Sequence, residues 1–218
     1  MKNLIIILLI ILSSLSIYGQ NHFIGFKGGG SITNIYSSEI LSDLDISNRF
    51  GFRGGLTYDY KLNKSIELGA DILYSQRGYR PHIQFTDQFG NPINEPSTFL
   101  WYYNYLSVPL TVGLTTGNQV NGFINLGFVP SVLIDAKVAR KGEELLNSHN
   151  QITKYDLGGL LEIGGRYRLS EKTQLNLSLA YQQSFNTLTN ENFSPLAELK
   201  HWGVTLSLGI RYDISREK

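Results

Sequence analysis

Cysteine is absent from this 218-residue chain. Without thiols the protein has no disulfides, no thiolate metal ligands and no cysteine nucleophile. The chain also has no large excess of charge of either sign, because it contains 19 lysines and arginines and 18 aspartates and glutamates. Nucleic-acid binding normally needs a clear basic excess, so no nucleic-acid partner is expected.

An apolar run long enough to span a membrane as a helix is missing as well. The main apolar run, residues 4–12, is too short to cross the hydrocarbon layer. It follows Lys2 and precedes a stretch of small and polar residues that ends at Gly19. This order is typical of a secretory signal peptide. We therefore expect residues 1–19 to be a cleaved signal peptide and residues 20–218 to form a single domain.

Glycine and tyrosine are abundant, with 22 and 13 residues, and the C-terminal region shows how they are used. In residues 202–212, every second residue is apolar, which is the period of a β-strand. The residues between them are Gly, Thr, Ser and Arg rather than the Lys and Glu of a solvated strand face. Trp202 and Tyr212 end the apolar face, as expected at the two headgroup layers of a membrane.

The same alternation recurs along the chain. It predicts strands at residues 23–31, 50–60, 66–77, 105–115, 123–136, 157–169, 174–183 and 202–212. Pro109 and Pro130 lie inside two of them, where bulges or breaks are expected because proline lacks a ladder donor. Long connections are predicted near residues 33–48, 80–100, 137–153 and 186–200, and short ones at 61–65, 116–122 and 170–173. This alternation of long and short connections is typical of outer-membrane barrels. The sequence therefore predicts an all-β fold, an eight-stranded antiparallel transmembrane β-barrel with up-and-down meander topology. It is expected in the outer membrane, with both termini in the periplasm.

Aromatic residues on the apolar faces gather at two heights, which predicts two girdles around an aliphatic band. The outer girdle is predicted to comprise Phe52, Tyr74, Tyr102, Tyr181 and Trp202, and the periplasmic girdle Tyr58, Tyr60, Tyr167 and Tyr212.

Charged residues on the polar faces nearly balance, and charges buried in a narrow lumen must be paired. We predict a structural lumen cluster of Lys27, Arg53, Asp59, Glu67, Asp71, Arg77, Glu162, Arg166, Arg168 and Arg211. Strand direction places Asp59, Glu67, Arg166, Arg168 and Arg211 together at the periplasmic end, with Lys27, Asp71 and Glu162 nearer the middle.

Four stretches carry a family resemblance: GFKGGGSITNI (25–35), ELGADILYSQRGY (67–79), YNYLSVPLTVGL (103–114) and INLGFVPSVLI (124–134). On these the chain resembles the PorT-like outer-membrane β-barrel family of Bacteroidetes-type bacteria. Asp71 stands where that family usually has Glu. Ser207, Gly209, Tyr212 and Ile214 resemble the signal read by the barrel-assembly machinery, although four residues follow it here. The resemblance implies an accessory role in secretion of surface proteins.

No motif predicts a catalytic residue, cofactor or metal site. We therefore expect a non-enzymatic barrel with a structural or interaction role. Its expected partners are outer-membrane lipid, the barrel-assembly machinery during insertion, and secretion or envelope proteins. The alternative is a rim-site enzyme acting on lipid or peptide. Its best candidate base is His201, with Glu198 or a loop serine beside it.

Overall fold

The computed structural model describes residues 21–37, 45–93, 95, 97–140, 143–147, 152–189 and 198–215. The predicted signal peptide lies outside this part of the chain. Within the described residues there is no helix that is long and apolar enough to cross a membrane.

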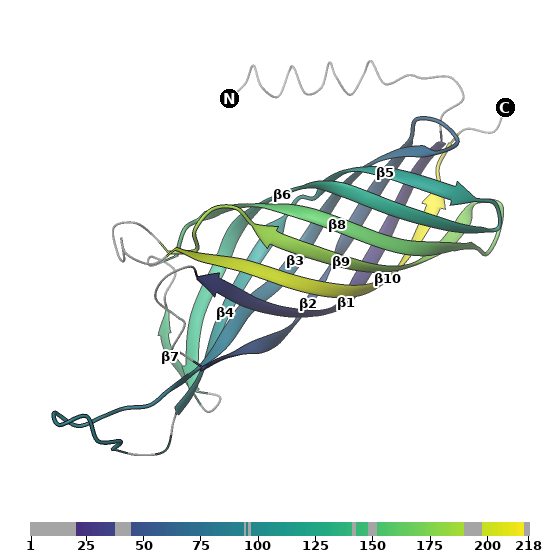
Figure 1. Cartoon of the computed structure of the whole chain (residues 1–218). Helices are drawn as coiled ribbons and strands as arrows, with labels where there is room; N and C mark the ends of the chain where they lie inside the picture. The colour runs from purple at the N-terminus through teal and green to yellow at the C-terminus, as the bar shows by residue number, and fades with distance from the viewer. Residues whose placement is uncertain are drawn as a thin grey trace, which may run out of the picture.

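Ten strands form one closed antiparallel sheet within the described residues (Figure 1). They are β1 (Asn21–Ser37), β2 (Asp45–Lys61), β3 (Ile66–Ile83), β4 (Ser97–Ser107), β5 (Leu110–Gly117), β6 (Val120–Arg140), β7 (Glu143–Asn147), β8 (Tyr155–Arg168), β9 (Thr173–Ser184) and β10 (Leu199–Asp213). β4 and β5 follow one another in a single ring position, between β3 and β6. β7 pairs only with the end of β6, and β10 closes the ring against β1. The predicted eight-stranded ring and meander are therefore confirmed.

The boundary between β4 and β5 falls at Val108 and Pro109, where a break was predicted. The backbone remains bonded across it: Val108 N donates to Pro130 O at 2.9 Å, and Asp71 N donates to Pro109 O at 3.0 Å. The break predicted at Pro130 is wrong, because β6 runs through this residue. Pro130 lies opposite the gap between β4 and β5. No ladder hydrogen bond from residue 130 is needed there, so proline, which has no backbone N–H, is tolerated.

Side chains alternate between the two faces of the wall as predicted. The outer face is apolar, with Leu208 68% and Leu126 61% exposed, while Arg211 on the inner face is 2% exposed. A few inner positions are apolar and buried: Leu73, Val129, Leu133 and Leu160. Val129 and Leu160 pack together with Ala180.

Eight of the nine predicted girdle aromatics lie on the wall half-buried or exposed. Tyr60 is the exception at 8% exposed, because the His22 ring lies 5.0 Å from its ring and covers it. His22 also hydrogen-bonds the Tyr58 hydroxyl at 2.8 Å. The periplasmic girdle predicted from sequence therefore includes an imidazole packed among its tyrosines.

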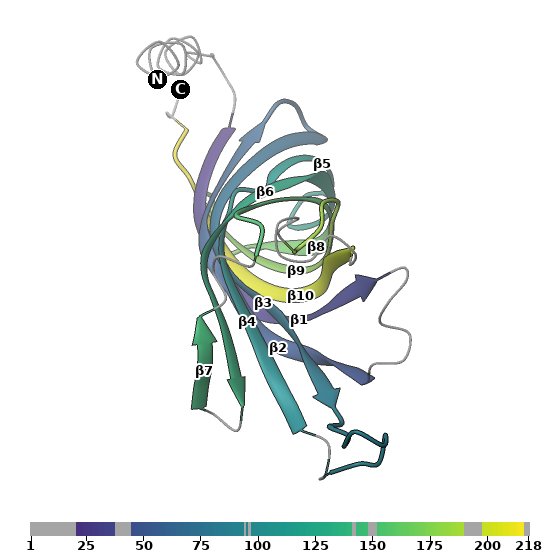
Figure 2. The ribbon, with the colours of Figure 1, turned by 90° about the vertical axis from the view of Figure 1, so that its left-hand side faces the viewer.

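The two ends of the barrel differ. At one end lie both described termini and the tight turns after β2, β5 and β8. Gly117 has a φ of +107°, which a residue with a side chain rarely adopts, and it lets β5 turn back into β6 through two residues. At the other end, called the tall end below, β2, β3, β4 and β6 extend beyond the remaining strands (Figure 2). Together with β7 they form the tall side of the wall. The segments read from sequence as loops at 33–48, 80–100 and 137–153 are thus partly strand.

Candidate functional site

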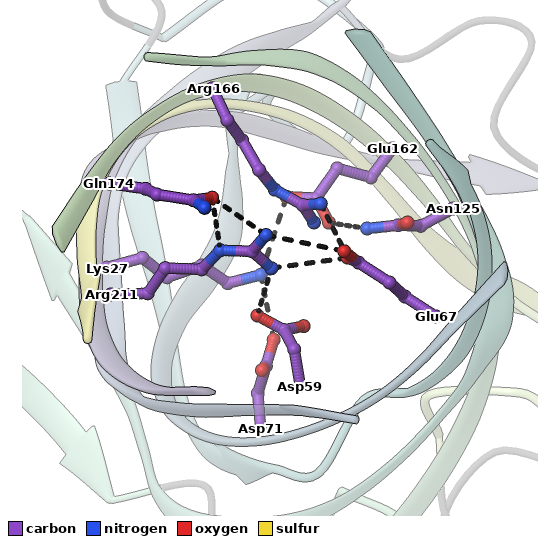
Figure 3. A network of polar contacts seen from close by, with 9 residues as sticks. All are labelled: Lys27, Asp59, Glu67, Asp71, Asn125, Glu162, Arg166, Gln174 and Arg211. Atoms are coloured by element: carbon purple, nitrogen blue, oxygen red, sulfur yellow. Dashed lines mark hydrogen bonds and ion pairs between the residues drawn. The ribbon is translucent and has the colours of Figure 1, made fainter. Parts of the chain in front are cut away.

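A charged cluster fills the lumen near the tight-turn end (Figure 3). Glu67 is its centre: Arg166 Nη1 donates to Glu67 Oε2 at 2.5 Å, and Arg211 Nη1 donates to the same oxygen at 3.2 Å. Arg211 also donates to Asp59 at 3.1 Å and to Gln174 at 2.9 and 3.0 Å. These residues come from β2, β3, β8, β9 and β10, so the cluster ties together strands far apart in the sequence.

Two aromatic rings hold the guanidinium groups of this cluster. The guanidinium carbon of Arg211 lies 4.1 Å from the centroid of the Phe23 ring, and that of Arg166 lies 4.1 Å from the Phe123 ring. Both rings are buried on the lumen side. Cation–π contact adds attraction while leaving the N–H groups free to bond carboxylates.

A second layer lies deeper in the lumen and is centred on Lys27. Its Nζ lies 2.7 Å from Asp71 Oδ2 and 3.4 Å from Glu162 Oε1. Asn125 Nδ2 donates to the other oxygen of Glu162 at 3.0 Å. Lys27, Asp71 and Glu162 thus form one ion-paired group, placed next to the Arg211 cluster.

A third layer lies toward the tall end. Arg77 Nη1 donates to Asp156 Oδ2 at 2.5 Å, and its Nη2 donates to Ser131 Oγ at 2.9 Å and Ser107 Oγ at 3.3 Å. The guanidinium carbon lies 4.5 Å from the Tyr105 ring centroid. Asp156 accepts a further bond from Ser184 at 3.0 Å. Arg77 therefore has a dedicated carboxylate, separate from those of the other two layers.

Two of the ten predicted lumen residues do not join these ion pairs. Arg168 is exposed, because it is the last residue of β8 and stands at the barrel mouth. Its predicted place in the cluster is therefore wrong. Arg53 is buried, at 7% exposed, but makes no ion pair within 4.0 Å among the described residues.

Sequence reasoning missed three partners that complete the network: Asn125, Asp156 and Gln174. Asn125 and Gln174 have the parity of the inner face, but the predicted cluster contains charged residues only. Asp156 lies one residue before the predicted strand 157–169, whereas β8 begins at Tyr155.

An apolar plug closes the lumen at the tall end. Tyr103 is fully buried and Tyr105 is 1% exposed. Ile152 and Leu188, which belong to none of the strands, pack in the same cluster. His201 lies beneath, edge-on to the Tyr103 ring at 5.2 Å between centroids. Glu198, its suggested catalytic partner, is exposed and lies 3.4 Å from Lys200. His201 and Glu198 therefore do not form the rim site considered from sequence, and no group of three or more His, Asp or Glu in the described chain is arranged to hold a metal ion.

Ion conduction is expected to be absent. The cavities beside Arg53 and Lys27 measure only about 30 Å³ each, and the apolar plug fills the lumen at the tall end. A cavity needs roughly 10–15 Å³ to hold one water, so neither is a water-filled channel. Purified protein in planar lipid bilayers should show no stable single-channel steps. Regular steps that persist after repurification would contradict this structure of the lumen.

A family model described as "Outer membrane protein beta-barrel domain" matches residues 18–190. Among solved structures, Neisserial surface protein A (NspA) has a TM-score of 0.51 at 14% identity, covering 90% of this chain and 99% of that chain. Outer membrane protein OprG from Pseudomonas aeruginosa has a TM-score of 0.52 at 12% identity, covering 90% of this chain and 97% of that chain. These likenesses show a shared fold. No curated protein matches the chain. Since the family model spans most of its length, the chain belongs to the outer membrane protein β-barrel domain family.

Proposed function

We propose that this protein is a non-enzymatic outer-membrane barrel of the PorT-like group, which binds an envelope protein through its tall side. The role is structural or interactive, as an accessory to protein secretion or envelope assembly. The described lumen is filled by paired charges and an apolar plug, so it leaves little space for a substrate. His201, the best candidate base, is 3% exposed and packs against tyrosines.

The observation that carries the proposal is the tip formed by residues 84–93, which follows β3 and projects beyond the barrel (Figure 1). It presents Phe89 at 78%, Ile93 at 55% and Phe85 at 46% exposed. These apolar side chains lie past the wall that contacts lipid. Apolar side chains grouped away from the lipid-facing wall mark an interaction site.

The tip is held in shape by Asp87. Its Oδ1 accepts hydrogen bonds from the backbone N–H groups of Phe89 at 2.8 Å and Asn91 at 2.9 Å. The N–H donors of Asn91 and Phe89 lower the pKa of the Asp87 carboxyl below its ordinary value. Gly90, at a φ of +86°, completes the turn. A pre-formed turn loses less entropy on binding than a flexible loop.

The alternation of short and long connections supports one orientation. We place the tight turns and both termini in the periplasm and the tip outside the cell, as in barrels with short periplasmic turns. Outer-membrane lipid then surrounds the apolar wall, and the barrel-assembly machinery reads the C-terminal strand during insertion.

Because the chain has no cysteine, one experiment tests both orientation and partner binding. Phe89→Cys cells are treated with a membrane-impermeant, thiol-reactive photo-crosslinker and then irradiated. We expect labelling of the tip and a photo-adduct with another envelope protein. Lys64→Cys, exposed in the β2–β3 turn, is the matched control and should stay unlabelled in intact cells.

Two outcomes contradict the proposal. Labelling at position 64 in place of position 89 would reverse the orientation. Labelling at position 89 without any protein adduct would show that the tip has no protein partner, leaving the barrel a structural element alone.

A further inference from the structure

The cavity in the upper lumen has an unusual lining. It lies between β1, β2, β3, β9 and β10 and measures about 30 Å³. Its charged lining residues are Arg53 and Arg77, and it has no carboxylate in its lining. The cavity beside Lys27 differs, because Asp59, Asp71 and Glu162 line it together with two cations. Lining charge therefore favours an anion in the upper cavity.

Several polar groups of this cavity lack partners, although Arg77 and Ser184 in its lining bond Asp156. Among the described residues, no hydrogen-bond acceptor reaches Arg53 Nε or Nη2, and Ser31 Oγ, Ser75 Oγ and Gln182 Nε2 are also without a partner. Arg53 is 7%, Ser31 4% and Ser75 3% exposed. Buried polar groups are bonded in nearly all native structures, so such a group of unsatisfied atoms calls for a ligand.

The chemistry of these groups selects that ligand. A guanidinium group and an amide nitrogen only donate hydrogen bonds, and serine hydroxyls are able to donate. One small acceptor is able to satisfy several of these donors at once. A cation would instead face the guanidinium group of Arg53, which has no carboxylate within 4.0 Å in the described structure.

The lumen carboxylates near Arg53 are engaged by other cations. Lys27 holds Asp71 at 2.7 Å and Glu162 at 3.4 Å. Arg77 holds Asp156 at 2.5 Å. Arg53 therefore has no carboxylate within ion-pair distance in the described structure, although a buried charge needs a counter-charge close by.

We propose that the upper lumen binds one small monovalent anion of halide size, held by Arg53 with Ser31, Ser75 and Gln182. The volume limits the ligand: about 30 Å³ has room for one or two water-sized groups, since one water needs roughly 10–15 Å³. The bound anion supplies the counter-charge of Arg53 and joins β1, β2, β3 and β9. The site is independent of the tip and its protein partner.

Bromide is the probe, because its anomalous scattering distinguishes it from water. In wild-type crystals grown in bromide, we expect an anomalous peak within hydrogen-bond distance of Arg53 and the two serines. In detergent, bromide should raise the unfolding midpoint by about 2–4 °C relative to gluconate at equal ionic strength. Gluconate is too large for the cavity and serves as the reference anion.

Three variants decide the assignment. Arg53→Gln should lose both the peak and the bromide-dependent shift. Arg168→Gln removes the same charge from an exposed site and should keep both. If Arg53→Gln fails to fold, the double variant Ser31→Ala and Ser75→Ala, which keeps Arg53, should show a smaller shift. A wild-type map with ordered waters only, or a bromide shift that is equal in wild type and the cavity variants, would overturn the proposal.

Discussion

Arg211→Ala is expected to lower the free energy of unfolding by about 3–5 kcal/mol, the typical cost of removing one partner of a buried ion pair. Arg211 is 2% exposed and donates to Asp59, Glu67 and Gln174. Its loss leaves Glu67 with Arg166 alone and leaves Asp59 without its cation. The remaining carboxylates then face a low-dielectric interior with too few donors. Urea unfolding of the barrel in lipid vesicles measures this change.

Arg168→Ala is the matched control. It removes the same side chain from an exposed strand end, where no ion pair holds it in the described structure, and should change the unfolding free energy by less than about 0.5 kcal/mol. Glu67→Ala should not add its full cost to that of Arg211→Ala, because the two residues share one interaction. Equal unfolding free energies for the Arg211 and Arg168 variants would show that the ion pairs of Arg211 in the lumen do not stabilise the barrel.

The fold was predictable because the two faces of a barrel wall require apolar and polar residues to alternate along each strand. A repeat of two fixes which residues face inward, and so the sequence alone places Glu67, Arg166 and Arg211 in the lumen. Pro109 likewise marked the boundary between β4 and β5, since proline cannot donate to a ladder.

Pairing inside the lumen was not predictable in the same way. Alternation gives the direction of a side chain, but its height depends on the stagger between strands. Arg53 and Arg77 both point inward, yet Arg77 reaches Asp156 while Arg53 reaches no carboxylate within 4.0 Å in the described residues. Arg168 also keeps the inward parity, but the strand ends there and water reaches it.

The tall side was missed for a different reason. Residues 137–153 lack sustained alternation, so they were read as a loop, whereas β6 continues to Arg140 and β7 pairs back onto it. Beyond the membrane a strand needs no apolar face toward lipid. The period that identifies the barrel wall therefore disappears where the strands leave the bilayer.

Arg77→Ala is the second change with a large expected effect. It removes the only cation within 4.0 Å of Asp156 in the described structure and takes donors from Ser107 and Ser131. Asp156 would keep the Ser184 hydroxyl, which cannot replace a charge. We expect a loss of about 3–5 kcal/mol in the free energy of unfolding, measured in the same vesicles.

Combining the two changes tests whether the lumen is one network or several layers. Arg77 and Arg211 share no hydrogen-bond partner, and the Lys27 group and an apolar layer of Val129, Leu160 and Ala180 occupy the lumen besides them. The losses in the double variant should therefore add, to within roughly 0.5 kcal/mol. Arg77→Lys, which keeps the charge but loses the planar fork, should recover part of the stability. A double variant no less stable than Arg211→Ala alone would mean that the charges act as one cooperative unit and that the layered description is wrong.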